Sequence, residues 1–192
     1  MNNHWKEILG NSLSTIGTIQ AAIGSTPQFH LNQNQSYQWR LIGNVLQALG
    51  SALSADGQGG PSLERLGDNI QAIGNSTVIT GLLLYGTSDT ETEQKIIISG
   101  NWIQALGSFT ALTDEFFDNT EEGRAENIIG NLLQGIGNAL QALSGVQVLY
   151  GNSINQGQLG VAGSWIQTAG SVITLIGEFL EESEEIRLDI DE

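Results

Sequence analysis

The chain has 192 residues, enough for one domain with a sizeable core. Six basic and 21 acidic residues give a formal net charge of −15, which argues against a nucleic-acid binder because such proteins neutralise phosphates with Lys and Arg. The absence of cysteine excludes a disulfide framework, a thiolate nucleophile and a zinc–thiolate site. The first residues lack a basic segment followed by an apolar one, so we expect no secretory signal and a cytoplasmic location.

Apolar residues at helical spacing predict six helices. They cover about 3–24, 36–55, 61–86, 90–117, 120–151 and 158–182. The short connections make successive helices antiparallel neighbours, so the expected fold is all-α, with three hairpins at about 3–55, 61–117 and 120–182. Residues 1–182 are expected to form a single domain, and 183–192 an acidic C-terminal tail. The pattern leaves open whether the hairpins close into a six-helix bundle or form a short array.

An eight-residue motif with glycine at both ends recurs six times along these helices. Its copies begin at Gly10, Gly43, Gly67, Gly100, Gly130 and Gly163. The first, third and fifth copies are 57 and 63 residues apart, and so are the second, fourth and sixth. The chain therefore contains three units of about 60 residues, each holding two motif copies.

The two glycines of each copy are seven residues apart, which places them on one face of a helix. Glycine inside a helix costs about 1 kcal/mol relative to alanine, so a compensating contact is required. We expect that contact to be the close approach of a neighbouring helix, as in glycine-mediated packing of antiparallel rods. The predicted helix-packing residues are Gly10, Gly17, Gly43, Gly50, Gly67, Gly74, Gly100, Gly107, Gly130, Gly137, Gly163 and Gly170.

Small polar residues follow the motif glycines, and glutamine stands four residues after the first glycine in every copy except the first, which has Ser14. These residues form either buried or interfacial polar ladders, or a solvated face. Residues 127–177 contain no charged side chain, whereas a solvated helix face normally carries Glu and Lys. The pattern therefore favours the ladders.

Chemistry-bearing motifs are missing from the sequence. No nucleophile motif occurs, and His4 and His30 lack the spacing of metal ligands. Acidic residues cluster around the turn at 114–126 and again from Glu178 to the C-terminus, without the ligand order of an EF-hand. We therefore predict no catalytic, cofactor-binding or metal-binding residue and no cofactor. An enzyme that uses a carboxylate cluster would need acids from different helices to converge in a cleft.

The clearest motif copies are Gly-Asn-Val-Leu-Gln-Ala-Leu-Gly at 43–50 and Gly-Asn-Trp-Ile-Gln-Ala-Leu-Gly at 100–107. They resemble a family of repetitive Gly-Asn-x-Ile-Gln-Ala-Leu-Gly proteins from Bacillus-type spore-forming bacteria, to which no activity is assigned. The resemblance covers Gly10 to Gly177 and implies no functional residue.

The leading functional hypothesis is a non-enzymatic structural protein that self-associates, so that its partner is a second copy of itself. The motivation is a charge-free polar helix surface, repeated at one register, that could pair between subunits. The alternative is a helical bundle that binds an apolar ligand or interacts with a membrane. Residues 69–88 and 96–113 lack charges, but polar residues interrupt the first stretch and the mean hydropathy is close to zero, so membrane insertion is not favoured.

Overall fold

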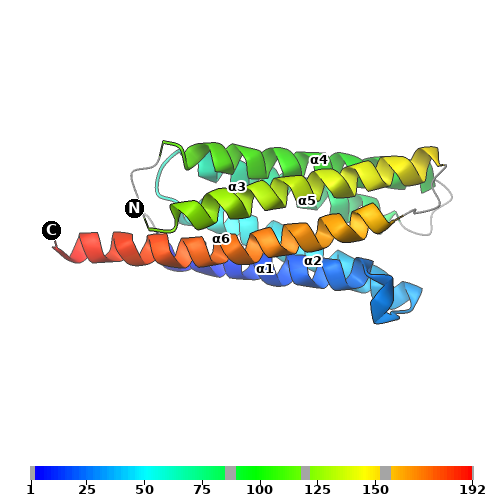
Figure 1. Cartoon of the computed structure of the whole chain (residues 1–192), viewed down its shortest axis with the longest axis horizontal. Coiled ribbons are helices and arrows are strands. Elements are labelled where there is room, and N and C mark those ends of the chain that lie inside the picture. Colours follow the sequence, from blue (N-terminus) through cyan, green and yellow to red (C-terminus); the bar gives the residue numbers. More distant parts are fainter. Residues whose placement is uncertain (1–2, 85–89, 118–121, 152–156, 192) are drawn as a thin grey trace.

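The computed structural model describes residues 3–84, 90–117, 122–151 and 157–191, with side chains up to Glu184. These residues form α1 (His4–Ser25), η1 (Pro27–Phe29), α2 (Gln33–Gly57), α3 (Leu63–Leu83), α4 (Thr90–Asp114), α5 (Arg124–Tyr150) and α6 (Gln158–Asp191), and none of them forms a β-strand (Figure 1). The predicted all-α fold with six antiparallel helices is confirmed.

The helices form three hairpins that close into a ring. Helices α1 and α2 pack together, as do α3 with α4 and α5 with α6. The hairpins join through α2 with α3 and α4 with α5, and α6 returns to pack against α1. The closed bundle, rather than the open array, is therefore the architecture. Because the number of antiparallel helices is even, both termini lie at one end of the bundle (Figure 1).

Local sequence explains where several helices begin. Asn3 and Ser62 cap α1 and α3, each accepting a hydrogen bond from the backbone N–H three residues later. Asn32 and Gln35 form a reciprocal capping box at the start of α2. Helix α6 continues to Asp191 through the stretch predicted as an acidic tail, where no Gly or Pro interrupts it, and Glu192 lies outside the described residues.

The twelve motif glycines meet in six pairs across the hairpin seams. A Cβ atom built on any of them would lie 2.5–2.9 Å from the carbonyl oxygen of its partner glycine. The pairs are Gly10 with Gly50, Gly17 with Gly43, Gly67 with Gly107, Gly74 with Gly100, Gly130 with Gly170, and Gly137 with Gly163. Distances this short leave no room for a side chain, so each hairpin is held by direct contact between two backbones.

The distribution of polarity is the reverse of that in an ordinary globular protein. Among the described residues, the core cluster of buried apolar side chains consists of Val78, Leu82 and Ile97, with Tyr37 and Leu41 packed against it. Most of the other buried side chains are polar, and the larger apolar side chains are mostly exposed. The ring thus encloses a polar interior, which contains the candidate site.

Candidate functional site

The repeat places its glutamines around the axis of the bundle in two layers. Gln47, Gln104 and Gln167, from the second, fourth and sixth copies, line one internal cavity. Their counterparts from the other three copies, Ser14, Gln71 and Gln134, line another. The three sequence units therefore surround the axis with approximate threefold symmetry, each contributing one residue to each layer. The predicted ladders of small polar residues are buried beside these layers.

The first layer is closed by hydrogen bonds between side-chain amides. Gln167 Nε2 donates to Gln47 Oε1 at 2.9 Å, and Gln141 Nε2 donates to Gln167 Oε1 at 2.8 Å. These bonds join α2, α5 and α6 across the interior. Gln104 on α4 is 3% exposed, and its Nε2 has no hydrogen-bond partner among the described residues.

The second layer links the first helix to the last. Thr15 Oγ1 lies 3.0 Å from Ser171 Oγ and 3.1 Å from the Ser171 carbonyl oxygen. Gln134 Nε2 donates to Thr174 Oγ1 at 2.9 Å. Side-chain hydrogen bonds of this kind satisfy interior groups that would otherwise be desolvated at a cost of about 1–3 kcal/mol each.

Three cavities follow one another along the axis. The cavity at the second layer measures about 20 Å³ and the one at the first layer about 40 Å³. The linings of these two cavities share no residue. They are one helical turn apart on α2 and α6, where Gln47 precedes Ser51 and Gln167 precedes Ser171, and two turns apart on α1, α3, α4 and α5. The third cavity measures about 290 Å³ and shares Arg40, Asn101 and Gln141 with the cavity at the first layer. The two small volumes suit single water molecules, which need roughly 10–15 Å³.

Three carboxylates line the cavity at the second layer, toward the end of the bundle that holds the termini. They are Glu64 and Asp68 on α3 and Glu178 on α6. Burial raises the pKa of Asp68 to about 7, aided by the charge of Glu7 and opposed by a hydrogen bond from Ser54. Burial likewise raises the pKa of Glu64 well above its usual value, and the charge of Glu178 adds to the effect. Asp68 occupies the motif position that holds Asn or Ser in the other five copies, a signal that the sequence analysis did not use.

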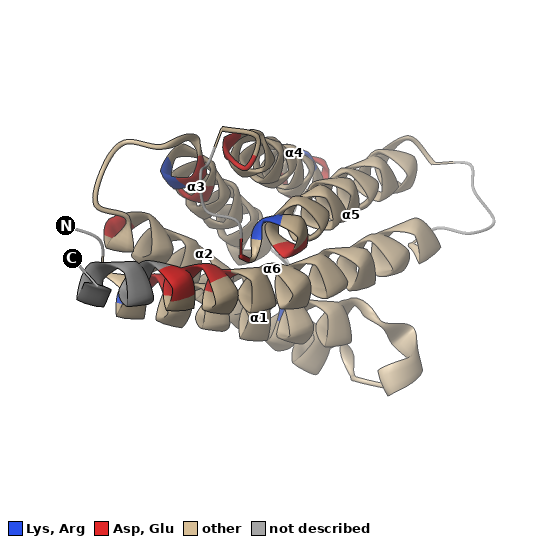
Figure 2. Ribbon diagram, turned by 60° about the vertical axis from the view of Figure 1, so that its left-hand side comes forward, with Lys and Arg blue, Asp and Glu red and all other residues tan. Residues whose placement is uncertain are grey.

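The two acidic clusters predicted separately from the sequence meet at this end. Most of the acidic residues gather there in Figure 2. The side chain of Asp114, which lies at the end of α4, accepts a hydrogen bond from Leu63 N at 3.0 Å, and Glu181 on α6 accepts one from Asn127 Nδ2 at 2.7 Å. Asp118 and Glu121 lie outside the described residues, as do the side chains beyond Glu184.

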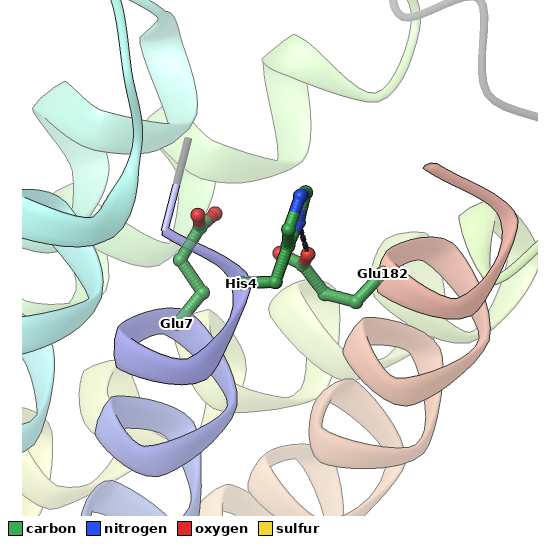
Figure 3. A group of neighbouring side chains, drawn as sticks. All are labelled: His4, Glu7 and Glu182. Carbon is green, nitrogen blue, oxygen red and sulfur yellow. Dashed lines mark hydrogen bonds and ion pairs between the residues drawn. The ribbon is translucent and has the colours of Figure 1, made fainter. Parts of the chain in front are cut away.

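His4, Glu7 and Glu182 form a second cluster at the seam between α1 and α6 (Figure 3). His4 Nδ1 pairs with Glu182 Oε2, and one ligand atom from each residue lies within 4.8 Å of the others. Both glutamates are buried. One imidazole nitrogen and two carboxylate oxygens are ligands that a divalent cation such as Zn²⁺ accepts.

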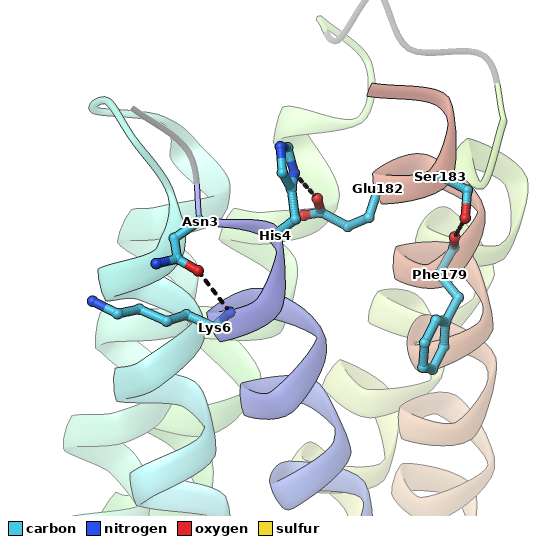
Figure 4. A network of polar contacts seen from close by, with 6 residues as sticks. All are labelled: Asn3, His4, Lys6, Phe179, Glu182 and Ser183. Atoms are coloured by element: carbon cyan, nitrogen blue, oxygen red, sulfur yellow. Dashed lines mark hydrogen bonds and ion pairs between the residues drawn. The ribbon is translucent and has the colours of Figure 1, made fainter. Parts of the chain in front are cut away.

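Sequence analysis assigned no metal role to His4, because 178 residues separate it from Glu182 and no local pattern links them. Figure 4 shows how the surrounding helix ends are held. Asn3 Oδ1 accepts from Lys6 N at 3.3 Å, and Ser183 Oγ donates to the Phe179 carbonyl oxygen at 2.6 Å.

A family model matches residues 5–175, nearly the whole chain. The chain belongs to DUF6944, a family of unknown function. No curated protein and no solved structure matches it. The repeat that builds the polar axis thus lies almost entirely within the part that defines DUF6944.

All six helices of this DUF6944 chain carry exposed large apolar side chains, which together we call the apolar belt. The motif residue that precedes the second glycine points outward in every copy and is Ile, Leu or Ala. These residues are Ile16, Leu49, Ile73, Leu106, Ile136 and Ala169, and all are exposed. Exposed aromatic side chains such as Trp102 and Trp165 lie among them. The motif therefore has a glycine face toward the hairpin partner, a polar face toward the axis and an apolar face outward.

Exposed hydroxyl groups on this surface bond to their own helix. Thr80 Oγ1 donates to the Ser76 carbonyl, Ser99 Oγ to that of Lys95, and Thr113 Oγ1 to that of Phe109, each at 2.9 Å. This pattern satisfies a hydroxyl without water.

By length and composition alone, one described helix of this DUF6944 chain qualifies as a membrane span, the stretch Gln158–Glu184 of α6. The inward polar residues lower the mean hydropathy of each helix, so the apolar outer faces are less visible in a linear average.

Proposed function

We propose that this DUF6944 protein is a non-enzymatic bundle embedded in a lipid bilayer, with its apolar outside in the hydrocarbon and its polar side chains facing inward. The observation that carries the proposal is the exposure of large apolar side chains on every helix of a closed ring. A soluble protein rarely exposes contiguous apolar patches larger than a few hundred Å². The bilayer replaces the cytoplasmic location that the sequence favours.

The dimensions of the bundle support this location. Each helix contains a stretch without Asp, Glu, Lys or Arg, and we take these stretches as the membrane-spanning segments: 8–25, 41–55, 69–83, 96–113, 127–150 and 158–177. Four of them contain 18 to 24 residues and are roughly 27–36 Å long, whereas 41–55 and 69–83 contain 15 residues and are roughly 22 Å long. The hydrocarbon core of a bilayer is about 30 Å thick.

Lipid suits the outer surface better than another protein chain does. A second copy would cover one side of the ring, whereas lipid covers all six helices together. The hydroxyls of Thr80, Ser99 and Thr113 already have backbone partners, as hydroxyls in hydrocarbon require.

The polar ladders that led us to expect self-association lie inside the ring, where they pair within one chain and offer no surface to another copy. The two small polar cavities do not suit an apolar ligand, whereas an open pocket of about 620 Å³, whose lining includes Pro27, Val161 and Ala162, lies between η1 and the start of α6. From the motif resemblance we also infer a source among Bacillus-type spore-forming bacteria.

Flotation with liposomes tests the proposal directly. We expect the full chain to co-float with the vesicles and to stay bound through an alkaline carbonate wash, because the apolar belt has no other cover. A chain that remains in solution as a monomer without detergent would contradict the proposal.

Lysine substitutions on the apolar belt should prevent insertion. Leu49 and Leu106 are each 58% exposed and lie in the middle of α2 and α4. Leu49→Lys or Leu106→Lys places a charge in the hydrocarbon at a cost of about 2.5–3.5 kcal/mol, so we expect a large loss of co-flotation. On a soluble surface the same changes would alter stability by only about ±0.5 kcal/mol. Phe117→Lys is the matched control, because Phe117 is 75% exposed but lies beyond the charge-free stretch of α4, and it should float like the wild type.

A further inference from the structure

The interior of the bundle holds polar groups that require a hydrogen-bonding partner. Asn75 Oδ1, Gln104 Nε2 and Asn138 Nδ2 have none among the described residues, although these side chains are at most 3% exposed. Gln104 lines the cavity at the first layer, which measures about 40 Å³. A buried polar cavity of this size takes up water, which replaces the lost hydrogen bonds.

The cavities extend from one end of the bundle toward the other. The cavity of about 290 Å³ lies where α1 ends and α2 begins, with Ser25 and Arg40 in its lining, and it continues into the cavity at the first layer. The cavity at the second layer follows, with Glu64, Asp68 and Glu178 toward the acidic end. Between these end groups, amides and hydroxyls from all three repeat units face the axis.

We propose that this axial row of amides and hydroxyls conducts water across the bilayer in single file and excludes ions. The inference rests on the membrane location proposed above. The cavities of about 20 and 40 Å³ are too small for a hydrated ion, and the first-layer residues Gln47, Gln104 and Gln167 carry no charge. The guanidinium of Arg40, which lines the cavities of about 40 and 290 Å³, adds a positive charge that disfavours cations on the path.

The amide hydrogen bonds of the first layer obstruct the path. Gln47 and Gln167 bond to each other directly, so passage of water requires their amides to exchange this bond for bonds to water. Gln104 lines the same cavity, and its Nε2, which has no partner among the described residues, is available to the incoming water.

Stopped-flow light scattering from proteoliposomes under an osmotic gradient tests the inference. We expect vesicles that contain the wild-type chain to shrink several-fold faster than protein-free vesicles, without a matching leak of K⁺ or protons. Gln104→Leu keeps the approximate volume but removes the amide, and should return the shrinkage rate close to that of protein-free vesicles. Gln147→Leu makes the same change at an exposed position of α5 and should leave the rate unchanged.

Arg40→Ala tests the exclusion of cations. Loss of the guanidinium from the cavity lining should raise the K⁺ leak of the vesicles while water flow persists. Flotation of the same samples separates the two proposals. Vesicles that carry the inserted chain but shrink no faster than empty ones, or equally fast with Gln104→Leu, overturn the water path and leave the membrane location standing. A chain that does not float overturns both.

Discussion

Replacing Gly17 with alanine is expected to destabilise the bundle by about 1–3 kcal/mol, the range typical of overpacked sites. The added Cβ would lie 2.5 Å from the carbonyl oxygen of Gly43 and 2.8 Å from the backbone nitrogen of Gln47. Both atoms belong to the backbone of α2, so the contact is relieved only by separating the two helices. Helix propensity alone predicts the opposite sign, because alanine in a helix is favoured over glycine by about 1 kcal/mol.

Chemical or thermal unfolding in detergent micelles, followed by circular dichroism, measures this change. Gly60→Ala is the matched control, because a Cβ at Gly60 meets nothing within 4 Å, and its effect should stay within about ±0.5 kcal/mol. The double variant Gly17→Ala/Gly43→Ala should cost less than the sum of its parts, because one separation of α1 from α2 accommodates both methyl groups. A stabilising Gly17→Ala would show that the seam does not require bare backbone.

The number, order and pairing of the helices were predictable because they follow from local patterns. Spacings of seven residues predict helices, and short connections predict antiparallel hairpins. The orientation of the remaining faces was not predictable in this way. Once glycine occupies the seam, either the polar face around Gln104 or the apolar face around Leu106 can face the interior. The spacing of residues along the sequence is the same in both cases.

The candidate site was less predictable than the fold because it depends on ring closure. His4 and Glu182 meet only when α6 returns to α1. The same closure sets Thr15 against Ser171. Asp68 could have been singled out from the sequence as the one acid at a position otherwise held by Asn or Ser, but its burial follows from the packing of α3 in the ring.

The stability of the bundle in detergent should fall as the pH rises, because of the buried acids at the end of the ring. Asp68 lies just outside the charge-free stretch of α3 and next to Glu64 and Glu178 in the lining of the second-layer cavity. It accepts a hydrogen bond from Gln58, while the charge of Glu7 also acts on it. Its pKa rises from 3.8 to about 7 in the folded chain, mainly because of burial.

The direction of this pH dependence follows from the pKa values of Asp68 in the unfolded and in the folded chain. Below pH 3.8 both the folded and the unfolded chain carry the proton on Asp68, and the folded state keeps its full advantage. Between 3.8 and about 7 the unfolded chain loses the proton first. In that range stability decreases by about 1.4 kcal/mol for each pH unit and each such group. Above about 7 the contribution of Asp68 no longer changes.

At pH values above 7, Asp68→Asn should therefore raise the denaturation midpoint of the bundle. It should also reduce the slope of stability against pH between 3.8 and 7, as measured by unfolding at a series of pH values across that range. Some slope should remain, because the pKa of Glu64 is raised by burial as well.

Asp56→Asn provides the contrast. Lys6 lowers the pKa of this exposed carboxylate through a hydrogen bond, so the ion pair contributes above pH 3.8 and is lost as the pH falls below it. Asp56→Asn should therefore lower the midpoint slightly at neutral pH. An Asp68→Asn chain with the slope and midpoint of the wild type would mean that Asp68 is hydrated and charged, and the second-layer cavity would then be open to solvent at the acidic end.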